Sequence, residues 1–451
     1  MTLARKLAHY AHSLKFNHLP KEAVLEVKRR VIDSLGAAVS AFHSEPGKIT
    51  REISKSGNGN STVIGTRIKT SMPLATFANG SLIRYWDYND TYLSKEPAHP
   101  SDNLGAILSV AESEKSSGRD FITAAVLAYE VQCRLCDAAS LRTRGWDHVT
   151  YGSFSAACGA GYLMRLTEEK LEHALGIAGV AGMALRQTRV GEISHWKAPA
   201  FANAARNAVF ACELAKLGMT GPAPIFEGEK GFHKLVSGPF NLRTLGGAKT
   251  PFKILESYIK YYPVEYHAQA AVEAAIRLRP RLRSIANIQK IEVDTYDVAV
   301  EIIVKDPEKW KPKSRETADH SLPYIIARSL LDGKMTLNQF SDSKIHDPAA
   351  LRLMAKMKIR EDNKMTRAYP STLPIRIKIW EKGAEPVEET VDIPRGHYKN
   401  PMTDREVEEK FLRLTHPFLS SSQQENILDF VWTLERQNNL NHLMKELTVS
   451  S

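Results

Sequence analysis

The feature that most constrains this chain is a change in the spacing of its apolar residues well past the middle. Before that point, apolar residues recur every three or four positions in stretches such as 21–42, 120–140 and 169–185, which predicts helices. After it, the stretches 287–298 and 373–383 alternate apolar and charged residues, which predicts half-buried strands. A large helical part is therefore followed by a part that contains strands.

The 451 residues exceed the size at which a single core usually stops growing, about 250–300 residues. We expect a mostly α fold with a large all-helical domain over 1–270 and a smaller α+β lid domain over 271–400. The C-terminal helices over 401–451 are expected to rejoin the helical domain. The last helices begin near Thr403, where Glu406 completes the spacing of a capping box.

Two further helix patterns, 319–333 and 347–359, lie between the expected strands. At the other end of the chain, residues 1–16 are basic and amphipathic, and no small-residue cleavage site follows an apolar stretch. We therefore expect a folded first helix there.

Composition points to a cytoplasmic protein with no membrane partner. No apolar run approaches the roughly 20 residues that span a bilayer. The four cysteines lie in apolar helical segments, which suits a reducing compartment. Cys133 and Cys136 form a C-x-x-C, but they lie in one continuous helix pattern without a second cysteine pair, so we expect no metal there.

Lys and Arg exceed Asp and Glu by 61 − 51 = 10, and such a balance suits nucleic acid, a membrane surface or an anionic small molecule. The charges are scattered, and the densest basic run, 277–283, lacks interleaved aromatic residues. We expect no nucleic-acid partner. The alternative, a helical nucleic-acid-binding protein, predicts binding that falls steeply with added salt.

The segment 87–108 places a polar cluster between two apolar helix patterns. Ser101 is a good N-cap, so the helix is expected to begin there, with Asn103 in its first turn and His99 just before it. Free amide groups and the helix dipole would favour an anion such as a carboxylate beside His99. Asp87 and Thr91 add a base and a hydroxyl upstream, although Asp and Asn also cap helices without any catalysis.

Other polar residues occur in similar small-residue or aromatic settings. Each has a structural explanation as a solvated or core residue, but the set as a whole indicates a site. These residues are His148, Arg189, Lys197, Lys260, Glu265 and His267.

Six strings follow one another in order from residue 86 to residue 411: WDYNDTYLSKEPAHPSDNLG, LRQTRVGEISHWKA, GMTGPAPIFEGEKGF, KYYPVEYHAQAAVEAA, KWKPKSRETADHSLPY and PRGHYKNPMTDREVEEKF. In these strings the chain resembles the MmgE/PrpD superfamily of 2-methylcitrate dehydratases and cis-aconitate decarboxylases. The resemblance implies a homodimer whose helical domain is completed by the C-terminus and covered by an α+β lid. It also implies active-site positions at Asp87, Thr91, His99, His148, Lys197, Lys260 and Tyr324.

Glu265 stands where the decarboxylase branch typically has a histidine, so the resemblance favours the dehydratase branch. We expect a hydro-lyase that converts the tricarboxylate 2-methylcitrate to 2-methyl-cis-aconitate, as in the methylcitrate cycle of propionate metabolism, with citrate as a second candidate substrate. The alternatives on the same fold are decarboxylation of cis-aconitate and epimerisation of a dicarboxylate such as iminodisuccinate.

Dehydration beside a carboxylate requires removal of a weakly acidic C–H proton and protonation of a departing hydroxide. Lys197, Lys260 and Arg189 are candidates for stabilising the carbanion. His99, His148, Asp87 and Tyr324 are candidates for the proton transfers, with their roles left open. We expect no cofactor, because the cysteine spacing does not suit an iron–sulfur cluster; the alternative is Mg²⁺ held by the carboxylates of residues 87–90.

Overall fold

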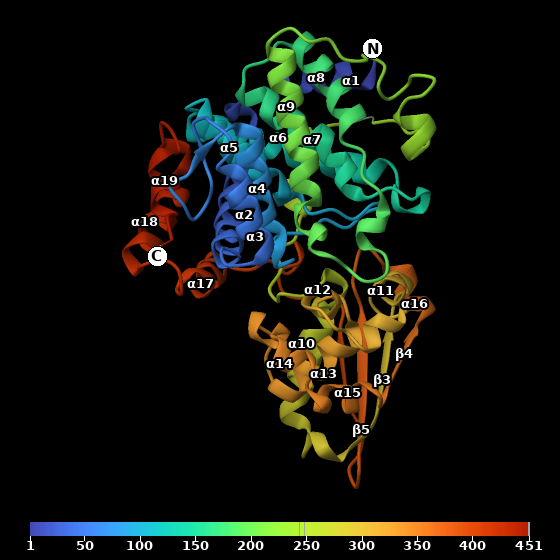
Figure 1. The fold of residues 1–451 in the computed structure, drawn as a ribbon. Coiled ribbons are helices and arrows are strands. Elements are labelled where there is room, and N and C mark those ends of the chain that lie inside the picture. The colour runs from blue at the N-terminus through green and yellow to red at the C-terminus, as the bar shows by residue number, and fades with distance from the viewer. Residues whose placement is uncertain (243, 248, 450–451) are drawn as a thin grey trace.

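The computed structural model describes residues 1–242, 244–247 and 249–449. The chain forms a large helical body and a smaller α+β body below it (Figure 1), which confirms the predicted fold class. The helical body contains α1 (Leu3–Ser13), α2 (Lys21–Ser40), α3 (Glu45–Ser54), α4 (Met72–Tyr85), α5 (Leu104–Ser113), α6 (Gly118–Ala138), α7 (Gly152–Leu163), α8 (Glu168–Ala181), α9 (Pro199–Lys216), α17 (Asp404–Thr415), α18 (Ser421–Trp432) and α19 (Asn441–Glu446), and a short hairpin of β1 (Ser61–Thr62) and β2 (Lys69–Thr70).

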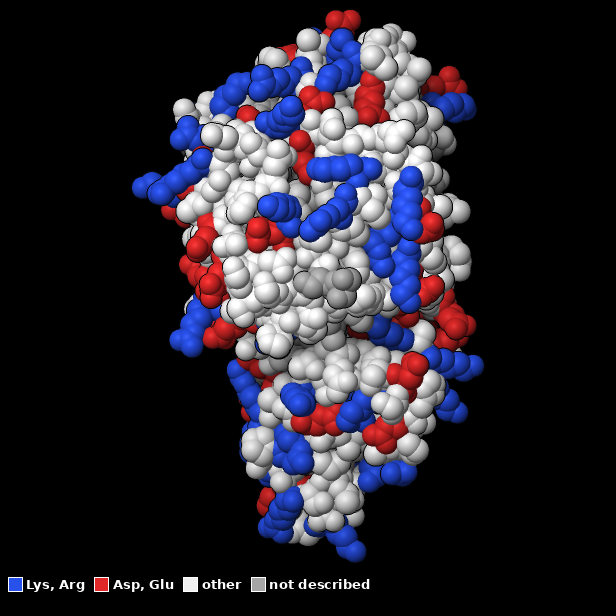
Figure 2. Space-filling view, turned by 60° about the vertical axis from the view of Figure 1, so that its left-hand side comes forward, with Lys and Arg blue, Asp and Glu red and all other residues white. Residues whose placement is uncertain are grey.

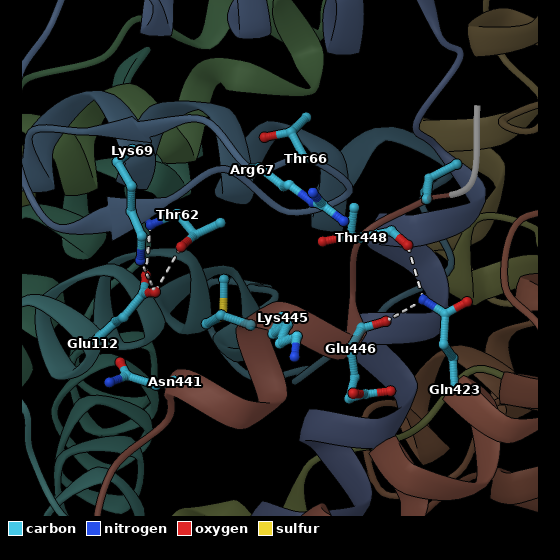
Figure 3. Close-up of a pocket in the computed structure, with 12 residues that line it drawn as sticks. Thr62, Thr66, Arg67, Lys69, Glu112, Gln423, Asn441, Lys445, Glu446 and Thr448 are labelled. Atoms are coloured by element: carbon cyan, nitrogen blue, oxygen red, sulfur yellow. Dashed lines mark hydrogen bonds and ion pairs between the residues drawn. The ribbon is translucent and has the colours of Figure 1, made fainter.

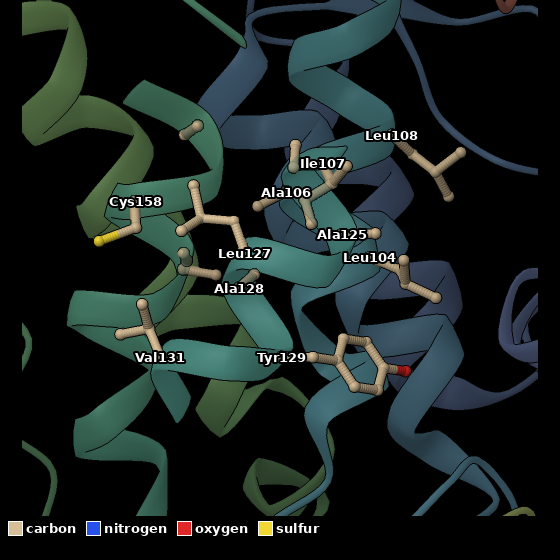
Figure 4. Close-up of a cluster of buried hydrophobic side chains, with 14 of the residues drawn as sticks. Leu104, Ala106, Ile107, Leu108, Ala125, Leu127, Ala128, Tyr129, Val131 and Cys158 are labelled. Carbon is tan, nitrogen blue, oxygen red and sulfur yellow. The ribbon is translucent and has the colours of Figure 1, made fainter. Parts of the chain in front are cut away.

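The core of the helical body is built from small and branched apolar side chains on closely packed helices. Figure 4 shows α5 and α6 contributing Ile107, Leu127 and Val131 to this core. A Cβ atom added to Gly105 on α5 would lie 2.7 Å from the Cα atom of Gly80 on α4. Only glycine therefore permits these two helices to approach so closely, and α4 ends directly at the segment that carries Asp87.

The C-terminal helices pack against the beginning of the chain. Helix α17 lies along α2, where a Cβ atom on Gly36 would lie 3.3 Å from the Cα atom of Phe411. Thr403 and Glu406 form the predicted capping box at the start of α17. Residues of α17, α18 and α19 belong to the same apolar core as residues of α1, α2 and α4 to α9.

The smaller body has its own apolar core and a four-stranded sheet in the order β4-β3-β5-β6. Strand β3 pairs parallel with β4 and antiparallel with β5, which pairs antiparallel with β6. Helices α10 and α13 pack together, and α10 contacts β5 and β6. The elements are α10 (Gln269–Leu278), β3 (Ile288–Thr295), α11 (Asp297–Ile303), α12 (Arg315–Ala318), α13 (Leu322–Asp332), α14 (Asp342–Ile345), α15 (Pro348–Met354), β4 (Met357–Glu361), α16 (Asn363–Ala368), β5 (Ile375–Glu381) and β6 (Val387–Val391).

The two predicted strands are present, and Ile375, Ile377 and Ile379 of β5 are buried as their alternation predicted. The helix expected over 347–359 is wrong in its second half. Helix α15 ends at Met354, and the following residues form β4. The segment pairs with β3, so the sheet decides its conformation over a weak helical periodicity.

No helix among the described residues is long and apolar enough to cross a membrane. Lys and Arg are interspersed with Asp and Glu over both bodies on the face shown in Figure 2. Cys133 and Cys136 are buried free thiols on α6, and burial raises the pKa of both well above that of an exposed thiol.

Candidate active site

A pocket lies where the segment after α4 and the segments around α9 face the smaller body. Its wall combines side chains from both bodies, and most of them are titratable. The lining residues are Arg84, Thr91, Leu93, Pro97, His99, His148, Arg186, Arg189, Ile193, Lys197, Glu265, His267, Ile302, Lys309 and His320.

Asp87 lies at the centre of the polar cluster beneath this pocket. It is buried and has φ 52°, in the left-handed region that few side chains other than Asn and Asp adopt. Lys260 Nζ lies 3.0 Å from Asp87 Oδ1, and Lys197 Nζ lies 3.5 Å from Oδ2. Burial alone would raise the pKa of Asp87, but Arg84, Lys197 and Lys260 together hold it well below its usual value. Asp87 is therefore a permanent carboxylate.

His99 presents one ring nitrogen to Asp87 and the other to the backbone. Its Nδ1 atom lies 2.8 Å from the carbonyl oxygen of Asp90. A carbonyl only accepts hydrogen bonds, so Nδ1 carries the proton and Nε2 keeps its lone pair. Nε2 lies 3.9 Å from Asp87 Oδ1. Burial, followed by the nearby cations, holds the pKa of His99 well below its usual value, which leaves Nε2 free to accept a proton.

Lys197 is buried between two carboxylates, 3.5 Å from Asp87 Oδ2 and 3.5 Å from Asp319 Oδ1. Lys197 lies just before α9, and the first residue of that helix, Pro199, suits a helix N-terminus. Burial lowers the pKa of Lys197 to about 8, against the opposing effect of Asp319 and Asp87. Lys197 therefore titrates close to neutrality.

His320 and Asp319 lie on the side of the cluster that belongs to the smaller body, and the sequence analysis missed them. His320 Nε2 lies 3.4 Å from Asp87 Oδ2, and its Nδ1 contacts Asp319. Burial lowers the pKa of His320 to about 4. The Asp-His pair directly before the N-cap Ser321 of α13 was the available signal, but Tyr324 in the same string was chosen instead.

His148 lies next to His99, with ring centroids 5.8 Å apart. Its Nδ1 atom lies 3.1 Å from Asp147 Oδ1, and the other oxygen of Asp147 accepts a 2.9 Å bond from Arg189 Nε. Burial lowers the pKa of His148 to about 3. His148 is therefore a neutral ring at physiological pH, and among the described residues neither of its ring nitrogens has a hydrogen-bond partner.

Glu265 and His267 form the part of the wall nearest the second body. Glu265 accepts a 2.8 Å bond from the backbone amide of His267, and His267 Nδ1 lies 2.6 Å from the hydroxyl of Tyr296. Burial raises the pKa of Glu265 and lowers that of His267 to about 3. Thr91 Oγ1 completes this group beside His99 Nδ1, at 3.2 Å.

Five of the predicted residues do not line the pocket: Asp87 and Lys260 lie in the cluster beneath it, and Ser101, Asn103 and Tyr324 lie elsewhere. The N-cap predicted at Ser101 is wrong: a 3₁₀ turn already begins at Pro100, and the Ser101 amide donates to the carboxylate of Asp90 at 2.9 Å. The anion at this turn is thus a side chain of the protein. Asn103 bonds within the helical core to Gln132 and Ser155. The Tyr324 hydroxyl donates to the carbonyl of Gln339 at 2.6 Å in the smaller body.

The atoms most able to hold a metal ion belong to Asp87, Asp319 and His320, and they lie within 4.8 Å of one another. Lys197 already pairs with both carboxylates, and Lys260 pairs with Asp87. A divalent cation there would have to displace these ammonium groups, so the donor set fits an ion-pair network better than a metal site.

A second pocket lies on the helical body between the β1–β2 hairpin and α19 (Figure 3). Its lining residues include no histidine. Lys69 and Thr62 there both bond to Glu112, so its buried acid is already neutralised. We therefore place the chemistry in the pocket that contains His99 and Lys197.

Comparison with known proteins shows the family of the chain. The profile of the MmgE/PrpD N-terminal domain matches residues 5–245, and that of the MmgE/PrpD C-terminal domain matches residues 262–436. The chain belongs to the MmgE/PrpD family and is a dehydratase-like enzyme.

Three relatives illustrate the range of names within the family. A 2-methylcitrate dehydratase of Cupriavidus necator is 31% identical over 68% of this chain and 66% of its own length. A 2-methylcitrate dehydratase of Escherichia coli is 29% identical over 74% of this chain and 73% of its own length. An alkylcitrate dehydratase of a fungal species is 30% identical over 90% of this chain and 86% of its own length.

Proposed function

We propose that this protein dehydrates 2-methylcitrate to 2-methyl-cis-aconitate by general acid/base catalysis, with citrate as a second substrate. The observation that carries the proposal is the placement of a free imidazole nitrogen and a lysine on opposite oxygens of one buried carboxylate. His99 Nε2 lies 3.9 Å from Asp87 Oδ1, and Lys197 Nζ lies 3.5 Å from Oδ2. The names of the relatives support the choice of a citrate-type substrate.

His99 is the proposed base. Its Nδ1 proton is directed to the Asp90 carbonyl, so Nε2 takes the proton from the carbon next to the carboxylate. The imidazolium that forms lies beside the Asp87 carboxylate, which stabilises its positive charge. Asp87 acts through His99 as a positioning residue.

Lys197 is the proposed acid. The pKa of about 8 keeps its ammonium mostly protonated at neutral pH yet able to release a proton. As the C–O bond breaks, the ammonium gives a proton to the departing hydroxide, and the electrons of the C–H bond form the double bond. Water and the unsaturated acid leave together, and solvent returns the proton from His99 to Lys197.

Negative charge builds up on the substrate carboxylate while the C–H bond breaks. Arg84 and Arg189 line the pocket as cations that are already held in place by Asp87 and Asp147. Pre-oriented cations stabilise such charge without having to reorganise during the reaction.

The test is incubation of the purified, chelator-treated protein with 2-methylcitrate, and in parallel with citrate and cis-aconitate. Ultraviolet absorbance of the conjugated product is followed while carbon dioxide is trapped. We expect absorbance to rise with 2-methylcitrate and the rise to be lost in His99→Ala and Lys197→Ala. Carbon dioxide from cis-aconitate without dehydration of 2-methylcitrate would replace the proposal with decarboxylation.

We also propose that the chain assembles as a homodimer, as the family resemblance implies. Large apolar side chains are exposed on and just after the neighbouring helices α8 and α9, at Val180, Phe210 and Leu217. Light scattering on the purified protein is expected to give twice the 50.4 kDa of the chain. A mass of one chain at micromolar concentration would contradict this.

A further inference from the structure

Most cations that line the pocket are already paired with carboxylates of the protein. Arg84 and Lys197 pair with Asp87, and Arg189 pairs with Asp147. Their charge is largely balanced before any substrate arrives. A tricarboxylate needs further positive charge, because three anionic groups leaving water must be compensated.

Lys309 supplies such a charge from the smaller body. It lies in the 3₁₀ turn Pro307–Trp310, is only 4% exposed, and lines the pocket. Within the described part of the chain, its ammonium has neither a hydrogen bond nor an ion pair. Buried lysines are almost always paired, so an ammonium that lines a pocket without a partner indicates a missing anion.

The backbone around Lys309 is held firmly in place. The Lys309 carbonyl accepts a bond from Ser321 Oγ, and its amide donates to the Asp306 carbonyl at 3.0 Å. Trp310 Nε1 donates to the Val304 carbonyl at 2.9 Å. Ser321 directly follows His320, so the turn that carries Lys309 is fixed to the segment that carries the lid side of the catalytic cluster.

Arg186 provides the corresponding charge from the helical body. It begins the 3₁₀ turn Arg186–Arg189, and its backbone amide is tied to the Gly145 carbonyl at 2.9 Å. Its guanidinium has no bonded partner among the described residues. Arg186 and Ile302 line both the pocket and an adjoining groove that opens beside Arg142 and Glu301, so Arg186 stands where the pocket meets the outside.

We propose that Lys309 and Arg186 each bind a carboxylate of the substrate, so that the site selects polycarboxylates that bridge the two bodies. The inference rests on the proposed function for the identity of the substrate. Neither residue moves a proton in the reaction. Both determine which acids bind, and the bound acid joins the lid to the helical body.

The test uses propane-1,2,3-tricarboxylate, which has three carboxylates but no hydroxyl group to lose, so its binding is measured at equilibrium by calorimetry. Lys309→Met and Arg186→Gln are expected to weaken its Kd by about 10- to 100-fold each, as expected for loss of a charged hydrogen bond. Lys309→Arg is expected to retain most of the affinity. Lys311→Met is the matched control, because Lys311 is exposed two residues further on, and its Kd is expected to match the wild type.

Steady-state kinetics separate this role from a catalytic one. Lys309→Met is expected to raise KM for 2-methylcitrate by a similar factor while kcat changes by less than about fivefold. Circular dichroism and thermal melting establish that each variant is folded, and Lys309→Arg provides the comparison if Lys309→Met is not.

Each outcome bears on one proposal or the other. Wild-type affinity in both Lys309→Met and Arg186→Gln would overturn the inference while leaving the dehydratase proposal standing. Lys309-dependent binding of the tricarboxylate by a protein that dehydrates neither 2-methylcitrate nor citrate would support the inference and overturn the proposed function. A wild-type protein that does not bind the tricarboxylate would overturn the inference.

Discussion

Lys260 Nζ bonds to Asp87 twice, at 2.6 Å to its backbone carbonyl and at 3.0 Å to its side-chain Oδ1. One ammonium therefore fixes both the backbone and the carboxylate of a residue that has a left-handed conformation. Lys260 is itself fully buried. Lys260 therefore fixes the Asp87 carboxylate in place and, with Arg84 and Lys197, lowers its pKa.

Asp87→Asn is expected to lower kcat/KM by about 10²- to 10⁴-fold, because a neutral amide cannot stabilise the imidazolium on His99. Asn tolerates the left-handed conformation, so the far-ultraviolet circular dichroism spectrum is expected to stay unchanged. Asp429→Asn on the exposed side of α18 is the control. Wild-type kinetics in Asp87→Asn would contradict a role for this carboxylate.

The pH profile of kcat/KM is expected to fall as pH rises through about 8, because Lys197 must be protonated to act as the acid and its pKa is lowered to about 8. The acidic limb is expected below pH 6.5, because the pKa of His99 lies well below its usual value and the base must be neutral.

Asp87 raises the pKa of Lys197, so the residual activity of Asp87→Asn is expected to have its alkaline limb at lower pH. A rate that stays constant up to pH 10 would argue against Lys197 as the acid.

His320→Gln is expected to lower kcat/KM by about 10²-fold, because the side chain contacts both Asp87 and Asp319. Tyr324→Phe, four residues further on, is the matched comparison. It is expected to keep kcat/KM within about twofold while reducing the free energy of unfolding by about 1 kcal/mol, through loss of the bond to Gln339. Kinetics and urea unfolding of both variants measure these effects. A larger loss of kcat/KM in Tyr324→Phe than in His320→Gln would support an active-site role for Tyr324 instead.

Lys410→Met is expected to reduce the free energy of unfolding by about 3–5 kcal/mol, because it leaves Asp33 buried without a countercharge. Lys410 Nζ lies 2.6 Å from Asp33 Oδ1 and also donates to the carbonyls of Tyr88 and Lys260. Denaturant unfolding measures the loss. Adding Asp33→Asn is expected to recover part of it, and exposed Arg405→Met on the same helix is the control. An unchanged free energy of unfolding in Lys410→Met would mean that the Lys410–Asp33 pair makes no net contribution to stability.

Local patterns in the sequence predicted the parts of the fold that depend on near neighbours. The capping box of Thr403 and the alternation of Ile375 with Arg376 involve residues within three positions of each other. Such local interactions can be predicted from the sequence alone. The 347–359 segment shows the limit of such reasoning, because its last residues take their conformation from β3, which lies about sixty positions away.

Residues of the candidate site could be predicted where their chemistry and the family resemblance pointed to the same positions. They could not be predicted where only tertiary contacts bring a residue to the site. The structure brings His99, Lys197 and Lys260 together around Asp87, although up to 173 positions separate them in the chain. In the sequence Lys309 resembles many other lysines, and it is distinguished only by its burial without a partner among the described residues. Ser101 has a side chain that is common at an N-cap, but in the structure its backbone amide donates a hydrogen bond to the carboxylate of Asp90.

Lys410 lies on α17, far along the chain, yet it donates to the carbonyl of Tyr88, which follows Asp87, and to the carbonyl of Lys260. During synthesis, α1 to α9 and the whole of the smaller body emerge from the ribosome before α17 does. Until then, Asp33 is without Lys410, and α2 is without one of the helices that pack against it. Domains commonly fold as units during synthesis, but here the core around α2 is completed only after α17 has been made.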